Sequence, residues 1–144
     1  PATPPATPPA TPPATPPATP PATEPTPIDI YVSSGSFSSP YYNFYTDAAG
    51  TTQLSNRTLN TNNVYRFRRL NNASSHAFYI SDNGYELASS TAITLEGDGN
   101  AALGITGSQE FTLTFNSVPA NLYYYCTAHS SMISLFNLTS DSAA

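Results

Sequence analysis

The sequence is short of basic residues, sulfur and histidine. Its 144 residues include no lysine and no tryptophan, one cysteine, one methionine and two histidines. A single cysteine excludes a disulfide framework within the chain, which leaves a free thiol, an intermolecular bridge or a metal ligand. Four arginines stand against nine acidic residues, and the net charge of -5 argues against nucleic acid or an anionic membrane surface as a partner.

Long hydrophobic runs are missing as well. No stretch approaches the roughly 18 apolar residues that a membrane-spanning helix needs, so we expect no membrane insertion. Residue 1 is proline, and we expect a signal peptide to have been removed before it. Few charges and much Ser, Thr, Asn and Tyr favour a secreted protein, located outside the cell or on its surface.

Residues 1–27 form a proline-rich repeat of the unit PATP. Proline fixes φ and removes amide donors, so the repeat predicts an extended polyproline II stalk on the order of 80 Å long. A four-residue repeat on a helix of about three residues per turn points successive threonines to different sides. This favours a stalk that carries O-glycans over a plain linker. The candidate sites are Thr3, Thr7, Thr11, Thr15, Thr19 and Thr23.

Residues 28–144 read as one all-β domain. Short alternating runs separated by turn residues predict eight strands, and this spacing is typical of a β-sandwich. In the clearest run, Phe111, Leu113 and Phe115 alternate with polar residues, as in a half-buried strand. The expected strands are 28–33, 41–45, 64–70, 77–81, 91–95, 109–115, 121–126 and 133–139.

The scarce sulfur and imidazole residues fall into one pattern. Cys126, His129 and Met132 are three positions apart and follow a predicted strand, and His76 comes just before another strand. Each of them alone is more often an ordinary core or surface residue. Together, two imidazoles, a thiolate and a weak thioether are the ligands of a blue-copper site, so we expect these four residues to bind one copper ion.

These residues resemble the ligands of the cupredoxins, the plastocyanin and amicyanin family. In that family a histidine before one strand joins a cysteine, a histidine and a methionine after a later strand, and the spacing C-x-x-H-x-x-M is similar to amicyanin's short ligand loop. The resemblance covers roughly residues 28–138 and implies a Greek-key β-sandwich. The stretches "SGSFSSPYYNFYTDAAG", "YRFRRLNNASSHAFYISDNGYE" and "LYYYCTAHSSM" resemble a cupredoxin-like module of extracellular, cell-surface and virion-associated structural proteins.

Other motifs are weaker. The stretch "LEGDGN" offers oxygen ligands for calcium but reads better as a hairpin turn; its residues are Glu96, Asp98 and Asn100. Arg66 and Arg68 share a strand face, where a solvated surface is favoured over pairing with carboxylates. Three sequons permit N-glycosylation without arguing for it; they are at Asn56, Asn72 and Asn137.

Two functions remain open. The favoured one is a subunit of an extracellular filament or surface coat, in which copies of the chain associate head to tail through a glycosylated stalk. The alternative is a tethered type 1 copper protein that transfers electrons. We do not expect an enzyme, because no Ser-His-Asp or paired-carboxylate arrangement is visible and the histidines are assigned to the metal.

Overall fold

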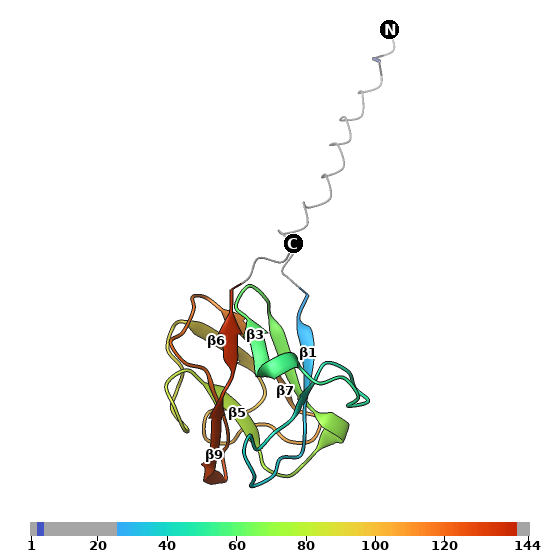
Figure 1. Cartoon of the computed structure of the whole chain (residues 1–144). Helices are drawn as coiled ribbons and strands as arrows, with labels where there is room; N and C mark the ends of the chain where they lie inside the picture. The colour runs from blue at the N-terminus through green and yellow to red at the C-terminus, as the bar shows by residue number, and fades with distance from the viewer. Residues whose placement is uncertain (1–2, 5–25, 141–144) are drawn as a thin grey trace.

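The chain forms an all-β sandwich (Figure 1). The computed structural model describes residues 3–4 and 26–140. The expected polyproline II stalk and the candidate glycosylation sites Thr7, Thr11, Thr15, Thr19 and Thr23 lie outside these residues, whereas Thr3 is described and exposed. Within the described residues, no helix is long and apolar enough to cross a membrane.

The larger sheet has five strands. They are β1 (Ile28–Val32), β2 (Phe44–Tyr45), β4 (Tyr65–Arg69), β6 (Ile93–Gly97) and β7 (Glu110–Phe115), in the order β2-β1-β4-β7-β6. The β1 and β4 strands are parallel, and the other pairs in this sheet are antiparallel. Buried residues alternate along β4 and β7, so one face of this sheet covers the core, as the alternating pattern predicted.

Three further strands form the second sheet. They are β5 (Phe78–Ser81), β8 (Tyr123–Cys126) and β9 (His129–Leu135), paired antiparallel in the order β5-β8-β9. A small parallel pair joins β3 (Thr58–Asn60) to β10 (Asn137–Thr139). Two 3-10 turns adjoin strands: η1 (Ser55–Arg57) directly precedes β3, and η2 (Leu70–Asn72) directly follows β4.

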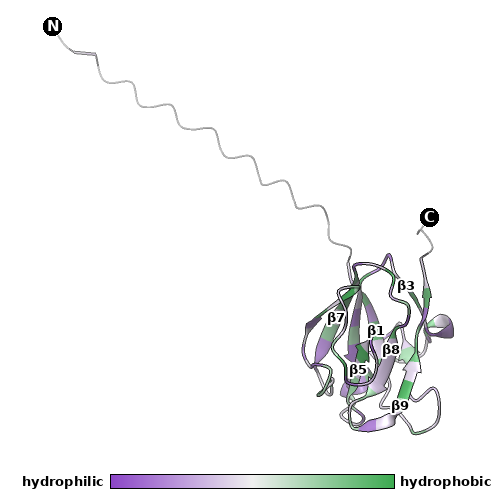
Figure 2. Ribbon diagram, turned by 90° about the vertical axis from the view of Figure 1, so that its left-hand side faces the viewer, coloured by the Kyte–Doolittle hydropathy of each residue, from purple (hydrophilic) through white to green (hydrophobic). Residues whose placement is uncertain are grey.

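The core between the sheets is aromatic. The ring of Phe78 stands within 5.1 to 6.3 Å of the rings of Tyr42, Phe44, Phe67, Phe111 and Tyr124. Burial of one such side chain contributes about 1.5–3 kcal/mol. Figure 2 shows apolar and polar residues alternating as bands along strands such as β7, as expected for strands with one buried face.

Two buried tyrosines donate hydrogen bonds from their hydroxyl groups to backbone carbonyls of loops. Tyr124 donates a hydrogen bond of 2.7 Å to the carbonyl of Pro40, and Tyr125 donates one of 2.7 Å to that of Ala101. A buried hydroxyl without a partner is costly, so these bonds let the core hold large aromatic residues and also fix the loops.

Strand assignments differ from the expected ones by more than two residues at three places. The expected strand 41–45 is reduced to Phe44–Tyr45, because Tyr41 has a φ of 72° and turns the chain. The expected strand 133–139 begins earlier, at His129, and is divided at Phe136, whose side chain enters the core. The β3 strand was not expected at all.

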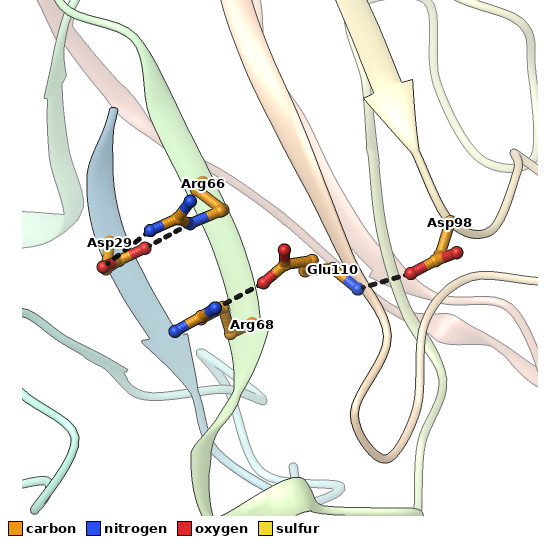
Figure 3. Close-up of polar contacts among 5 residues, drawn as sticks. All are labelled: Asp29, Arg66, Arg68, Asp98 and Glu110. Atoms are coloured by element: carbon orange, nitrogen blue, oxygen red, sulfur yellow. Dashed lines mark hydrogen bonds and ion pairs between the residues drawn. The ribbon is translucent and has the colours of Figure 1, made fainter. Parts of the chain in front are cut away.

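The arginines on the outer face of the larger sheet are paired, so the expectation of a merely solvated face is wrong (Figure 3). Arg66 Nε lies 2.6 Å from Asp29 Oδ1, and Arg68 Nε lies 2.6 Å from Glu110 Oε2. The partners come from β1 and β7, the two neighbours of β4, and face it directly across the sheet. Cross-strand ion pairs therefore fix the positions of the arginine side chains on this face of the sheet.

The stretch "LEGDGN" is not the expected hairpin turn: its first three residues end β6, and Asp98, Gly99 and Asn100 begin the loop that leads to β7. Asp98 accepts a hydrogen bond of 3.1 Å from the amide of Glu110, drawn in Figure 3. The side chain of Asn100 accepts bonds of 2.9 Å from the amides of Ala102 and Leu103. These oxygens hold the local backbone, and Glu96 is exposed on β6.

Candidate metal centre

The candidate metal ligands lie at the end of the sandwich that is far from the start of β1. The parallel strands β1 and β4 run from Ile28 and Tyr65 to Val32 and Arg69. Arg69 at the end of β4 contacts the carbonyl of His76. In Figure 1 the start of β1 and the hairpin of β9 lie at opposite ends of the domain.

Cys126 and His129 face each other across a tight hairpin. Cys126 is the last residue of β8 and is buried, and His129 is the first residue of β9. Two residues separate them, and they are partners in the β8–β9 ladder. Cys126 Sγ lies 3.4 Å from His129 Nδ1. Backbone pairing thus sets the position of two of the candidate ligands.

His76 approaches the same sulfur from another loop. It lies two residues before β5, and its Nδ1 is 3.8 Å from Cys126 Sγ. Its φ of 50° lies in the left-handed region, which is costly for a residue with a side chain. Hydrogen bonds of 2.7 Å from the Tyr42 hydroxyl and 3.1 Å from Arg69 Nη1 hold its carbonyl.

The three residues fit one metal ion. Their ligand atoms all lie within 4.8 Å of one another. Metal–nitrogen bonds of about 2.0–2.1 Å and metal–sulfur bonds of about 2.3 Å, separated by a tetrahedral or trigonal angle, place nitrogen and sulfur roughly 3.6 Å apart. The observed distances of 3.4 and 3.8 Å lie on either side of this value.

Met132 is the fourth residue that the sequence assigned to the site. It is fully buried in the core cluster on β9, three residues after His129. The β8–β9 register shifts between Tyr125 and Cys126, so β9 is irregular next to Met132. The structure therefore brings His76, Cys126 and His129 together and places Met132 on the strand that carries one of them.

An exposed aromatic residue packs against both histidines. The ring of Phe37 meets the rings of His76 and His129 edge-on, at centroid distances of 5.0 and 4.9 Å. The preceding loop needs Gly35, because its φ is 89° and a Cβ there would lie 2.9 Å from the ring of Tyr42. The contacts of Phe37 with the histidines were not expected from the sequence, since Ser, Gly and Phe carry no metal-ligand signal.

The electrostatics favour neutral imidazole. The pKa of His76 is lowered, first by its burial and then by the nearby His129 and Arg69. Burial also raises the pKa of the Tyr42 phenol, and Cys126 adds to this effect. Metal binding requires an unprotonated imidazole nitrogen, so a lowered pKa at His76 keeps that nitrogen ready for a metal at neutral pH.

The segments around the site carry no carboxylates. Residues 33–43, 71–79, 99–107 and 118–134 contain no Asp, Glu, Lys or Arg. The thiolate of Cys126 is thus the one anionic ligand that these segments can offer. Two imidazoles and a thiolate suit a soft or borderline transition metal, whereas magnesium and calcium prefer oxygen ligands.

Two residues that support the site were also missed from the sequence. Tyr42 holds the carbonyl of His76 and contacts the core, and its role had no signature in a tyrosine-rich chain. Arg69 did have one. It shares the strand face of Tyr65 and Phe67, so the alternation that placed Arg66 and Arg68 outside placed Arg69 inside.

The sequons occupy exposed positions with different surroundings. Asn56 lies in η1 and Asn72 in η2, and both have positive φ values. The side-chain nitrogen of Asn137 donates a bond of 2.6 Å to the carbonyl of Asn56. A glycan on Asn137 would break that hydrogen bond, which joins two of the three sequons. Glycosylation of Asn72 would leave it in place.

Comparisons with known proteins add no relative. No family model matches the chain, and comparisons with curated proteins and with solved structures give no significant match. The fold and the cluster of His76, Cys126 and His129 are compatible with a cupredoxin-like site. That likeness rests on the ligand pattern and its geometry alone.

Proposed function

We propose that this chain is a tethered, cupredoxin-like copper-binding domain with a type 1 site. The observation that supports it is the meeting of two imidazole nitrogens and one thiol sulfur from separate segments, at 3.4 and 3.8 Å. In the proposal His76 and His129 would hold the ion through Nδ1, Cys126 would hold it through Sγ, and Met132 would be the fourth, weaker ligand. A bound copper ion would supply one-electron chemistry.

The ligand set favours copper over zinc. Structural zinc sites are closed by four strong ligands, whereas two imidazoles, one thiolate and a distant thioether are typical of blue copper. The hairpin between β8 and β9 and the bonds on the carbonyl of His76 hold the ligands in place without metal. Such a frame resists the change of geometry that accompanies reduction and oxidation.

The position of the site suits a carrier that meets a partner. His129 is partly exposed at the end of the domain that is far from Ile28, where the stalk joins. A partner can therefore approach the site from the end of the domain opposite to Ile28. The electron-transfer role follows from this placement and from the resemblance to the cupredoxins.

Metal analysis tests the proposal. The full-length protein is loaded with Cu(II) or Zn(II), dialysed and analysed for bound metal, in parallel with His76→Gln and with Asn72→Gln as a control on a neighbouring loop. We expect one copper per chain in the wild type and the control, and much weaker retention in His76→Gln. Equal retention by all three proteins, or none by the wild type, would refute the site.

A second candidate function is the extracellular structural subunit, and one observation favours it. The ladder between β1 and β2 covers Tyr31 and Val32, so among the described residues the first half of β1 pairs with β4 alone. Such a half-open strand can add to another sheet. Head-to-tail association through the stalk would then build an open array.

Deletion of residues 1–27 tests the structural candidate. Full-length protein from its native source should form filaments visible by electron microscopy and carry O-linked sugar by intact-mass analysis, and the deletion should leave a folded monomer by light scattering. A native full-length protein that stays monomeric at high concentration would rule out this candidate and leave the copper-binding proposal in place.

A further inference from the structure

Arg69 is a buried cation that has no carboxylate partner within the part of the chain that the structure describes. Its side chain lies at the end of β4 and the residue is 3 % exposed. Among the described residues the ion pairs are Arg66 with Asp29 and Arg68 with Glu110, and neither involves Arg69. A buried charge without compensation is strongly destabilising, so this guanidinium must be stabilised in another way.

Backbone carbonyls supply that stabilisation. Arg69 Nη1 donates to the carbonyls of His76 at 3.1 Å and Ile105 at 2.9 Å, and Nη2 donates to those of Ser33 at 2.9 Å and Ser75 at 2.8 Å. These acceptors belong to three segments that surround the metal site. The planar fork of arginine can hold several acceptors at fixed angles, which a lysine cannot do.

We propose that Arg69 is the positioning residue of the metal centre: it locks the loop that carries His76, and it supplies the internal positive charge that balances the thiolate of Cys126. The inference rests on the proposed copper function. It assigns to Arg69 a role that the ligand pattern does not include.

The locking role follows from the geometry at His76. The backbone there is in the left-handed region, and two of the four guanidinium bonds end on the adjacent carbonyls of Ser75 and His76. The hydroxyl of Tyr42 adds a bond to the same carbonyl, and the Tyr42 ring lies under the guanidinium, with Cζ 5.8 Å from its centroid. Arg69 therefore holds the loop through two hydrogen bonds, and its own side chain is buried.

The balancing role follows from the charges nearby. The surrounding segments contain no carboxylate, so the thiolate of Cys126 is the anion that can offset the guanidinium. Arg69 Nη1 lies 3.1 Å from the carbonyl of the candidate ligand His76, so the charge of the guanidinium stands next to the site. A fixed positive charge favours the less positive oxidation state, so Arg69 is expected to raise the reduction potential of bound copper.

Two substitutions separate the roles. Arg69→Met removes both the positive charge and the planar guanidinium with its hydrogen bonds. Arg69→Lys keeps the charge but removes the guanidinium. Arg66→Met, which removes an arginine from the outer face, is the matched control. For the copper-loaded full-length proteins, the reduction potential is measured by voltammetry and the release of copper by competition with a chelator.

We expect the potential of Arg69→Met to fall by about 59 mV, a tenfold change in the relative affinity for the two oxidation states. Arg69→Lys should keep the potential near that of the wild type, yet both Arg69 variants should release copper about tenfold faster. The control should match the wild type in both measurements. Unchanged potential in Arg69→Met, or unchanged release in both variants, would overturn the inference.

A measurement on the wild type covers the case in which Arg69→Met fails to fold. The side-chain nitrogen resonances of Arg69 should shift when Zn(II) fills the site and those of Arg66 should stay, since Zn(II) leaves the protein diamagnetic. Unmoved Arg69 resonances at full zinc occupancy would overturn the inference. A wild type that binds neither zinc nor copper refutes the proposed function itself, and the two failures are thus distinguishable.

Discussion

The ring of Phe37 contacts the imidazole of His129 edge-on at 4.9 Å, although Phe37 is 66 % exposed. It makes a similar contact with His76 at 5.0 Å. Single exposed apolar residues are common on protein surfaces, so the ring contacts, and not the exposure, give Phe37 a role. Here the exposed ring bridges two candidate ligands that come from different loops, so it acts as an outer support of the site.

Phe37→Ala should therefore loosen the site and leave the fold intact. Aromatic contacts of this kind contribute about 0.5–1.5 kcal/mol each, whereas changes at exposed positions shift overall stability by about 0.5 kcal/mol. We expect nearly unchanged thermal unfolding of the metal-free protein and faster loss of bound copper to a chelator. Leu103→Ala, at another exposed apolar residue, is the control; an identical copper loss in both variants would contradict the role of Phe37.

The aromatic core makes a second prediction at Phe78. The ring is fully buried and contacts aromatic residues from both sheets, Phe111 on β7 and Tyr124 on β8. Phe78→Ala should lower the free energy of unfolding by about 3–5 kcal/mol because it leaves a cavity. Urea unfolding followed by tyrosine fluorescence measures this, with the exposed Val118→Ala as the control. A loss below about 1 kcal/mol would mean that the sheets do not pack as described.

The third prediction concerns the pair of Asp29 and Arg66. Their side chains are 29 % and 34 % exposed, so solvent screens the attraction. A double-mutant cycle with Asp29→Asn and Arg66→Met should give a coupling of about 0.2–1 kcal/mol, which decreases as salt is added. A coupling above 2 kcal/mol, or one that salt leaves unchanged, would show that the pair is more buried than in Figure 3.

The fourth prediction concerns pH and His76. Its pKa in the folded protein is lowered from 6.5, chiefly by burial. The unfolded chain therefore binds a proton at this residue more readily than the folded one, and stability falls as the pH drops below 6.5 until the folded pKa is passed. Urea midpoints of the metal-free protein between pH 5 and pH 8 should show this decline. His76→Gln should flatten it, and an equal decline in the variant would assign the effect to other groups.

Much of the fold could be predicted from the sequence, because hydrophobic alternation reports which face of a strand is buried. This holds for Glu110–Phe115 and Tyr65–Arg69. The β3 strand could not be found, since it has three residues and pairs with β10, which is far away in the sequence. The start of β9 was also hidden, because its first residues, His129, Ser130 and Ser131, lack an apolar alternation.

The candidate site also contains residues that could be predicted from the sequence and residues that could not. The scarcity of cysteine and histidine predicted which residues meet, and the structure brings His76, Cys126 and His129 together. The supporting residues are common types whose role depends on three-dimensional contacts. Tyr42 acts from 34 positions away in the sequence on the carbonyl of His76, and no local pattern encodes that bond.

The central claim is that Cys126 Sγ and two imidazoles bind copper, and visible absorption during a Cu(II) titration of the full-length protein tests it most directly. A type 1 site should give an intense blue thiolate-to-copper band that saturates at one equivalent. Cys126→Ser should show no band while it keeps the folded structure by circular dichroism. A wild type that stays colourless, or a serine variant with the same band, would contradict the account.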